Sequence, residues 1–133
     1  MQRLPSRPIL CIEFSVLHEH KYGWQDDFIG DVPLAGAMRF LWECGKYFDV
    51  YICSPKSHRA ASRASIQGWV ETHFEDYMEK IGEGALAPSY LGMLKYPVQE
   101  PPCFLRIDDR AITFQGEFPT PEDLKRFQPW WRR

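Results

Sequence analysis

Two adjacent carboxylates, Asp108 and Asp109, follow directly on the apolar run 103–107. If that run is a buried strand, both acids emerge together at the rim of a sheet, where like charges are costly unless a cation or a donor offsets them. A hard cation that prefers oxygen ligands, such as Mg²⁺, would do so. Arg110 and the first turn of a helix beginning after Thr120 would also serve, so the dipeptide predicts either a metal site or a self-contained acidic turn.

A hydroxyl and an ammonium group follow a second apolar run. Ser54 comes directly after the run 50–53, and Pro55, Lys56 and a helix that Ser57 can cap come next. A hydroxyl, an ammonium group and helix-terminal N–H groups can converge on one anion, so Ser54 and Lys56 form a candidate phosphate cradle. The alternative is that Ser54 and Ser57 only cap the helix.

The other residues able to bind metals form weaker patterns. His18 and His20 make an H-x-H pair that could bind a transition metal together with Glu13 or Glu19. The cysteines are scattered without a C-x-x-C pair, and most of them sit in apolar runs. They are Cys11, Cys44, Cys53 and Cys103. We interpret them as small buried hydrophobic side chains rather than ligands or disulfides.

Apolar runs and helical periodicities predict the elements that position these groups. Strands are expected at 9–14, 50–53, 91–95 and 103–107, and helices at 34–47, from 57 through 70, and after Thr120. Residues 15–33 have few periodic apolar positions and are expected to form a long loop. The alternation predicts a single α/β domain over residues 1–133 with a mostly parallel sheet. Such sheets bind ligands at the carboxyl ends of their strands, which is where the candidate residues fall.

Composition excludes several classes of function. The 133 residues include 16 Lys and Arg against 18 Asp and Glu, which gives a net charge of −2. General nucleic-acid binding is not expected, because phosphate contacts need a basic excess. No stretch approaches the roughly 18 consecutive apolar residues that span a bilayer, and residues 1–8 lack the apolar core of a signal peptide. We therefore expect a cytoplasmic protein that does not bind membranes.

In this order the pieces resemble the haloacid dehalogenase-like hydrolase superfamily, specifically its small members found in bacteria and their phages. The strongest match is to that subfamily's metal-binding fourth motif and C-terminal signature. It comprises the run 104–112 with Phe114, Gly116, Phe118, Pro119, Leu124, Pro129 and Trp130. The run 50–54 resembles the second motif, whose terminal Ser or Thr binds phosphate. The runs 33–37 and 16–24 resemble the start of the first helix and the stretch after the catalytic loop.

The resemblance implies a three-layer Rossmann-like domain without a large cap domain. It also implies Mg²⁺ bound by Asp108 and Asp109 and a phosphate bound at Ser54. The family's first motif is Asp-x-Asp-Gly after the first strand, where one Asp attacks phosphorus and the other transfers protons. That motif is missing from this chain.

Two alignments of the first motif are open. A gapless alignment puts Ile12 and Phe14 at the two Asp positions, and a one-residue deletion puts Glu13 and Ser15 there. An apolar pair can neither attack nor bind metal. A Glu displaces the nucleophile, and a displacement of about 1 Å can cost on the order of a hundredfold in rate. A Ser cannot transfer protons near neutral pH, so either alignment predicts crippled chemistry.

The third motif is also altered. In the subfamily a Lys precedes a Pro pair and steadies the phosphate, whereas Glu100 precedes Pro101 and Pro102 here. A carboxylate at this point would repel a phosphate. Lys95 could substitute if the loop folds back.

We therefore expect a catalytically degenerate member of the family, a pseudo-phosphatase that binds a protein or a phosphorylated small molecule, with Mg²⁺ binding weakened or lost. The alternative is a Mg²⁺-dependent phosphohydrolase in which Glu13 is the nucleophile or a metal ligand and Asp109 is the other ligand. A third possibility is a structural subunit of a larger assembly. The segment 130–133, Trp-Trp-Arg-Arg, is either an interface patch or packed on the domain's own surface.

Overall fold

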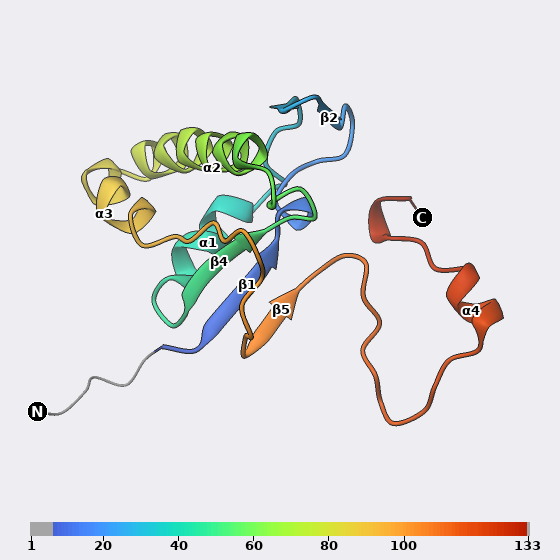
Figure 1. The fold of residues 1–133 in the computed structure, drawn as a ribbon. Coiled ribbons are helices and arrows are strands. Elements are labelled where there is room, and N and C mark those ends of the chain that lie inside the picture. The colour runs from blue at the N-terminus through green and yellow to red at the C-terminus, as the bar shows by residue number, and fades with distance from the viewer. Residues whose placement is uncertain (1–6, 133) are drawn as a thin grey trace, which may run out of the picture.

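A three-stranded parallel sheet organises the fold. The computed structural model describes residues 7–132. The sheet contains β1 (Ile9–Glu13), β4 (Asp49–Cys53) and β5 (Leu105–Ile107) in the order β4-β1-β5 (Figure 1). β1 is central, and Leu10 pairs with Val50 on one side and with Leu105 on the other. The predicted α/β class with a parallel sheet is confirmed.

The remaining elements are helices, short turns and a small hairpin. The α-helices are α1 (Ala37–Cys44), α2 (Ala60–Lys80), α3 (Ala87–Leu91) and α4 (Pro121–Lys125). The 3₁₀ turns are η1 (Phe14–Val16), η2 (Gly84–Leu86) and η3 (Trp130–Arg132), and β2 (Trp24–Gln25) pairs with β3 (Phe28–Ile29) in an antiparallel hairpin. No helix within residues 7–132 is long and apolar enough to cross a membrane.

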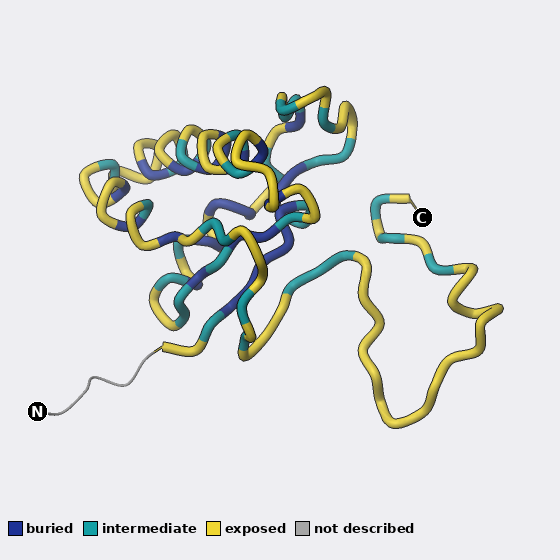
Figure 2. Tube along the Cα trace, viewed as in Figure 1, coloured by how far each residue is buried: buried dark blue, intermediate teal, exposed yellow. Residues whose placement is uncertain are grey.

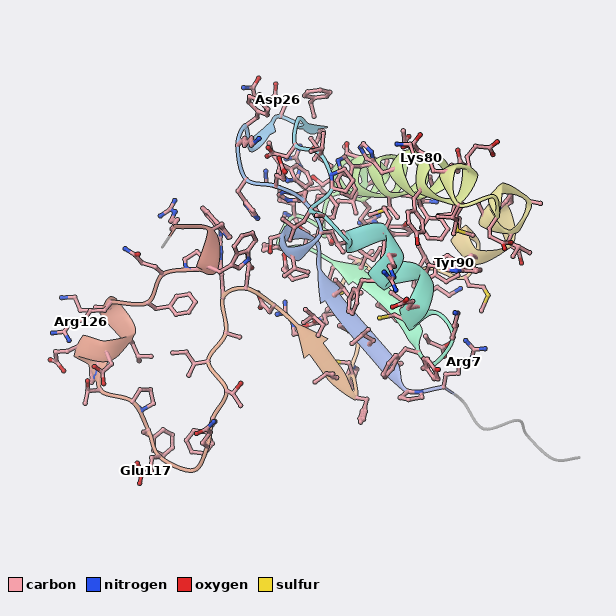
Figure 3. The ribbon with its side chains drawn as sticks, turned by 180° about the vertical axis from the view of Figure 1, so that it is seen from behind. Arg7, Asp26, Lys80, Tyr90, Glu117 and Arg126 are labelled. Atoms are coloured by element: carbon pink, nitrogen blue, oxygen red, sulfur yellow. The ribbon has the colours of Figure 1, made fainter. Side chains whose placement is uncertain are left out.

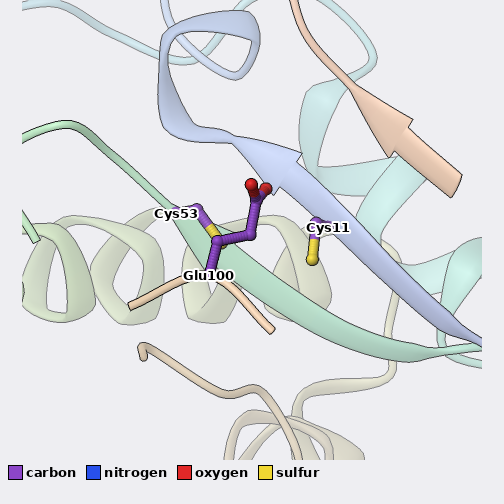
Figure 4. A group of neighbouring side chains, drawn as sticks. All are labelled: Cys11, Cys53 and Glu100. Atoms are coloured by element: carbon purple, nitrogen blue, oxygen red, sulfur yellow. The ribbon is translucent and has the colours of Figure 1, made fainter. Parts of the chain in front are cut away.

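The hydrophobic core lies on one face of the sheet. It joins Leu10, Ile12, Val50 and Ile52 of the strands to Met38, Leu41, Ile66, Val70 and Phe74 of α1 and α2. Cys11 and Cys53 are buried on the opposite face, which the irregular segment 97–103 covers (Figure 4). The described residues thus form two layers, with the helices of the core on one face, and the third layer of the expected three-layer domain is not seen among them.

Several predicted boundaries change for local reasons. The helix expected at 34–47 spans only Ala37–Cys44, and its late start follows from Gly36, which adopts a left-handed φ of 86° just before it. The segment 91–95 contributes a single bridge between Lys95 and Tyr51 rather than a strand. The predicted cap of the last helix is confirmed, since Asp123 N donates to Thr120 Oγ1 at 3.1 Å.

The loop 15–33 is ordered by one buried carboxylate. Asp31 is 3% exposed and accepts hydrogen bonds from the backbone N–H groups of Lys21, Tyr22 and Gly23 at 2.8, 3.0 and 2.8 Å. Burial disfavours the charge of Asp31, but these donors hold its pKa below the ordinary value. The loop that contains the β2–β3 hairpin is therefore closed at its base by a charged hydrogen-bond acceptor.

After β5 the chain leaves the body of the domain. Residues 111–132, here called the C-terminal arm, are mostly exposed and swing outward before returning (Figures 1 and 2). Glu117 and Arg126 mark its outer part, away from Tyr90 and Lys80 on the helices (Figure 3). Phe118 is 89% exposed. Among the aromatic rings of the described residues its one contact is with Phe114, also in the arm and exposed, with ring centroids 5.0 Å apart.

Candidate functional site

The predicted site residues lie around one cavity at the carboxyl ends of the strands. It has a volume of about 410 Å³ and is lined by Glu13, Ser54, Lys56, Asp108 and Asp109, among others. The chain passes from β1 to β4 on one side of the sheet and reaches β5 on the other, so the crevice lies where the strand order reverses. Open α/β sheets bind ligands at such a point.

The cavity resolves which side chains of the first segment face the acidic turn. Glu13 and Ser15 contact Arg106 and Asp109, while Ile12 is fully buried in the core. Phe14 touches the cavity wall but is 1% exposed and packs edge-on against Trp69, 5.0 Å between centroids. This is the arrangement of the alignment with a one-residue deletion, and Glu13 does not point away from the cleft as the gapless alignment requires.

Arg106 connects the carboxylates of the cleft. Its Nη2 lies 3.0 Å from Glu13 Oε2, its Nε lies 2.7 Å from Glu100 Oε1, and its Nη1 binds Asp108. The parallel register pairs Arg106 with Cys11, which places its side chain on the face that also carries Glu13. Burial disfavours the charge of the guanidinium, but Glu100 and Asp108 hold its pKa above the ordinary value. One fixed cation therefore serves three acids.

Glu13 is a strongly perturbed carboxyl group. The residue is 8% exposed, and burial raises its pKa to about 7 even though Arg106 acts in the opposite direction. The negative charges of Asp108, Asp109 and Glu100 raise it further. Near neutral pH the group is therefore divided between its protonated and ionised forms, which is the range in which a carboxyl group can exchange protons.

The acidic turn is satisfied by the protein itself. Ser15 Oγ donates to Asp109 Oδ1 at 2.7 Å, and Trp131 Nε1 donates to Asp109 Oδ2 at 2.8 Å. Burial alone would raise the pKa of Asp109, but these donors hold it below the ordinary value. The backbone N–H of Arg110 donates to Asp108 Oδ1 at 3.0 Å. The donors are thus Arg106, Arg110, Ser15 and Trp131, and the helix after Thr120 plays no part.

These contacts decide how well Mg²⁺ fits the predicted ligands. Mg²⁺ requires oxygen ligands in near-octahedral geometry at about 2.0–2.1 Å. Glu13 Oε2 and Asp108 Oδ2 face the guanidinium of Arg106, Asp108 Oδ1 accepts a hydrogen bond from Arg110 N, and both oxygens of Asp109 accept hydrogen bonds. A metal ion between these acids would have to displace Arg106 or break the bonds to Asp109. The donor set as arranged does not fit the ion.

The phosphate cradle is built by a turn and not by a helix end. Lys56 N donates to Ser54 Oγ at 3.2 Å, and Ser54 N donates to Ser57 Oγ at 3.0 Å. The prediction that Ser57 caps the helix is wrong, because α2 begins only at Ala60. Its N–H groups do not line the cavity. The ammonium of Lys56 lies 4.3 Å above the ring of Trp24, a cation–π contact that holds it at the rim.

Two features of the cleft escaped the sequence analysis. The first is Arg106, which the sequence does indicate, because a single charged residue in an otherwise apolar strand needs an acidic partner. The second is the return of the arm: the ring of Trp131 stacks on His20 at 4.3 Å and 3°. Nothing in the sequence indicates that pair. Packing of the C-terminal tryptophan on the domain's own surface is confirmed for Trp131, and Arg133 lies outside the described residues.

The H-x-H pair and the substitute lysine do not form the sites considered for them. His18 is 4% exposed with Nδ1 2.6 Å from Glu19 O, and His20 Nε2 lies 2.7 Å from Ser15 O. Both rings therefore serve packing and backbone contacts. Lys95 is exposed and does not line the cleft.

No family model, curated protein or solved structure matches this chain. The resemblance to the haloacid dehalogenase-like superfamily therefore depends on the motif residues quoted above. The cleft itself offers a bound guanidinium, three acids that have partners within the protein, and a serine and a lysine at the rim.

Proposed function

We propose that this chain is a catalytically degenerate member of the haloacid dehalogenase-like superfamily, a pseudo-phosphatase that holds a phosphorylated small molecule without cleaving it. One observation carries the proposal: the guanidinium of Arg106 lies between the carboxylates of Glu13 and Asp108. A tethered side chain thus sits where the family's chemistry needs a metal ion. The strand order, with an acidic turn after β5 beside the central β1, supports membership of the family and its Rossmann-like fold.

The rim of the cleft supplies the groups for an anion. Lys56 and Arg110 line the cavity, and neither forms a salt bridge within residues 7–132. Ser54 lines the same cavity and adds a hydroxyl. The cavity of about 410 Å³ lies within the range of small-molecule sites, and Trp24 offers an aromatic surface. These groups favour a phosphate ester that carries a planar group.

Mg²⁺ binding is weakened or lost in this proposal. Arg106 offsets part of the charge of Glu13 and Asp108, and Ser15 and Trp131 occupy both oxygens of Asp109, so a cation would have to displace one of these partners. Residues Glu13, Asp108 and Asp109 then act as a frame that holds Arg106 and the C-terminal arm in place.

The alternative of an atypical phosphohydrolase keeps one point in its favour. Glu13 faces the cleft, as that alternative requires, and its pKa of about 7 suits proton transfer. Its Oε2 is nevertheless engaged by Arg106 at 3.0 Å, so a metal ion bound through that oxygen would have to compete with the guanidinium. A protein partner is favoured by a different feature, the exposed aromatic side chains of the arm, and would bind outside the cleft.

A turnover assay and a binding assay together test the proposal. The first measures Mg²⁺-dependent hydrolysis of an aryl phosphate and a panel of nucleotides by wild type and Asp109→Asn. We expect no turnover in either protein. Turnover that is lost in Asp109→Asn would overturn the pseudo-phosphatase and direct attention to Glu13.

The second assay measures thermal stabilisation by inorganic phosphate and nucleoside monophosphates without added metal. We expect stabilisation of the wild type that is lost in Lys56→Ala. Lys46→Ala is the matched control, because Lys46 also lies over a tryptophan, Trp42 at 6.0 Å, but does not line the cleft. Absence of stabilisation by every probe, or an equal loss in both variants, would contradict an anion site at Ser54 and Lys56.

A further inference from the structure

Three cysteines gather on the face of the sheet that the core does not use. Cys11 lies in β1 and Cys53 at the end of β4, and they are 0% and 5% exposed. Their Sγ atoms and a carboxylate oxygen of Glu100 all lie within 4.8 Å of one another. Figure 4 shows both thiols on one side of the strands, with Glu100 reaching them from the segment in front.

A third thiol completes the group. Cys103 follows Pro101 and Pro102 in the same covering segment, and its side chain interacts with the thiol of Cys11. The Sγ atoms of Cys11 and Cys53 lie within 4.8 Å of each other. The cysteines come from β1, β4 and the segment before β5, so only the folded sheet brings them together.

The surroundings of these thiols differ from those of a packed hydrophobic cysteine. Cys11 and Cys53 do not belong to the apolar cluster, whereas Cys44 does. Their neighbours are the carboxylate of Glu100 and the guanidinium of Arg106, with Arg106 Nε 2.7 Å from Glu100 Oε1. Two sulfurs and one carboxylate within 4.8 Å of one another, with the thiol of Cys103 next to Cys11, form a donor set of the kind that holds a soft divalent cation.

We propose that Cys11, Cys53, Cys103 and Glu100 form a tetrahedral Zn²⁺ site on this face of the sheet. Zn²⁺ binds Cys sulfur at about 2.3 Å and carboxylate oxygen at about 2.0–2.2 Å, so the donor atoms of Cys11, Cys53 and Glu100, within 4.8 Å of one another, need only a small contraction to close on the ion. Cys103, in the same segment as Glu100, would turn toward them as the fourth ligand. The site is linked to the cleft at the strand ends through the contact of Glu100 with Arg106, but none of its four ligands lines that cleft, and it does not depend on the proposed anion binding.

The neighbours of the proposed ligands and an access path suit such a site. Arg106 holds Glu100 by a charged hydrogen bond and would offset part of the negative charge that three thiolates and a carboxylate bring together. A second cavity of about 220 Å³, lined by Cys53, Glu100 and Arg106 among others, leads to the group from outside. Each thiol gives its proton to solvent on coordination, so the affinity falls as the pH is lowered.

Cobalt substitution tests the site directly. Full-length protein freed of metal and kept reduced is titrated with Co²⁺ and then with Zn²⁺. We expect one Co²⁺ per chain with a thiolate-to-cobalt charge-transfer band and tetrahedral visible bands, which Zn²⁺ abolishes. Cys103→Ser should lower the affinity for Zn²⁺ at least tenfold, because it removes a ligand from the most accessible position.

Two controls keep the result interpretable. Cys44→Ser changes a buried cysteine outside the group and should leave the bands unchanged, and Glu100→Gln should weaken binding without removing a thiol. The proposal is overturned if wild type gives no thiolate-to-cobalt band, if Cys103→Ser retains wild-type affinity, or if the band depends on Cys44. Asp109→Asn should leave the bands intact, which separates this site from the cleft.

Discussion

Replacing Glu13 with glutamine should change how the stability of the protein depends on pH. A carboxyl group whose pKa is higher in the folded than in the unfolded state binds its proton more tightly when folded. For Glu13 the pKa rises from an ordinary 4.5 to about 7 because of burial. Its contribution to stability is therefore fully present below pH 4.5 and is lost as the pH rises through 7.

The size of the effect follows from that difference. At about 1.4 kcal/mol for each pH unit, the rise from 4.5 to about 7 corresponds to roughly 3 kcal/mol of unfolding free energy. A glutamine does not titrate, and its carbonyl oxygen can still accept the hydrogen bond from Arg106 Nη2. The difference in unfolding free energy between Glu13→Gln and wild type should therefore grow in favour of the variant by about 3 kcal/mol from acidic to mildly alkaline pH.

Urea unfolding followed by tryptophan fluorescence between pH 4.5 and 8, in the presence of a chelator, measures this difference. Glu43→Gln is the control, since Glu43 forms an exposed ion pair with Arg39 at 3.0 Å and such pairs contribute little. A difference between Glu13→Gln and wild type that stays constant with pH would show that Arg106 fully offsets burial. Burial would then not raise the pKa of Glu13, and Glu13 would be an ordinary ion-pair partner of Arg106.

Two further predictions concern the loops around the cleft. Asp31→Ala removes the acceptor of three backbone N–H groups and should lower the unfolding free energy by about 3 kcal/mol or more near pH 7, as measured by urea unfolding. Because the pKa of Asp31 is lowered in the folded state, this loss should shrink as the pH falls below the unfolded value of 3.8. A loss that does not depend on pH would contradict the charged contact. Trp131→Phe keeps a ring on His20 but loses the hydrogen bond from the indole N–H to Asp109, and should lower the unfolding free energy by about 1–2 kcal/mol. Trp130→Phe, at the neighbouring half-exposed position, should lower it less. Equal losses in the two variants would refute the role of the indole N–H.

The sequence was sufficient to place the candidate residues but not to orient them. Parallel strands all end at one edge of the sheet, so acids and a serine that follow three apolar runs had to meet there. The sequence does not predict which face of the sheet carries Glu13, because β1 is buried on both faces and its apolar residues do not alternate with polar ones. The structure decides the point through Phe14, which packs against Trp69 and leaves Glu13 and Ser15 on the other side.

Long-range contacts account for what the sequence analysis missed. Arg106 reaches Glu13 only because β5 pairs with β1 in a particular register, and sequence spacing carries no information on that register. The cysteines were interpreted as scattered hydrophobic residues for the same reason, since Cys11, Cys53 and Cys103 are distant in sequence and adjacent only across the strands. The weak alternation of a strand as short as β5 leaves such pairings undetermined.

The carboxylate of Asp109 binds two distant parts of the chain at once. Its Oδ1 holds Ser15 at the end of β1, and its Oδ2 holds Trp131 at the end of the C-terminal arm. Any group that competes for this carboxylate therefore also competes with the anchor of the arm. By reciprocity, the factor by which a ligand in the cleft loosens the arm equals the factor by which capture of the loosened arm tightens that ligand. Exposed aromatic rings such as Phe118 thereby become thermodynamically linked to a site that they do not touch.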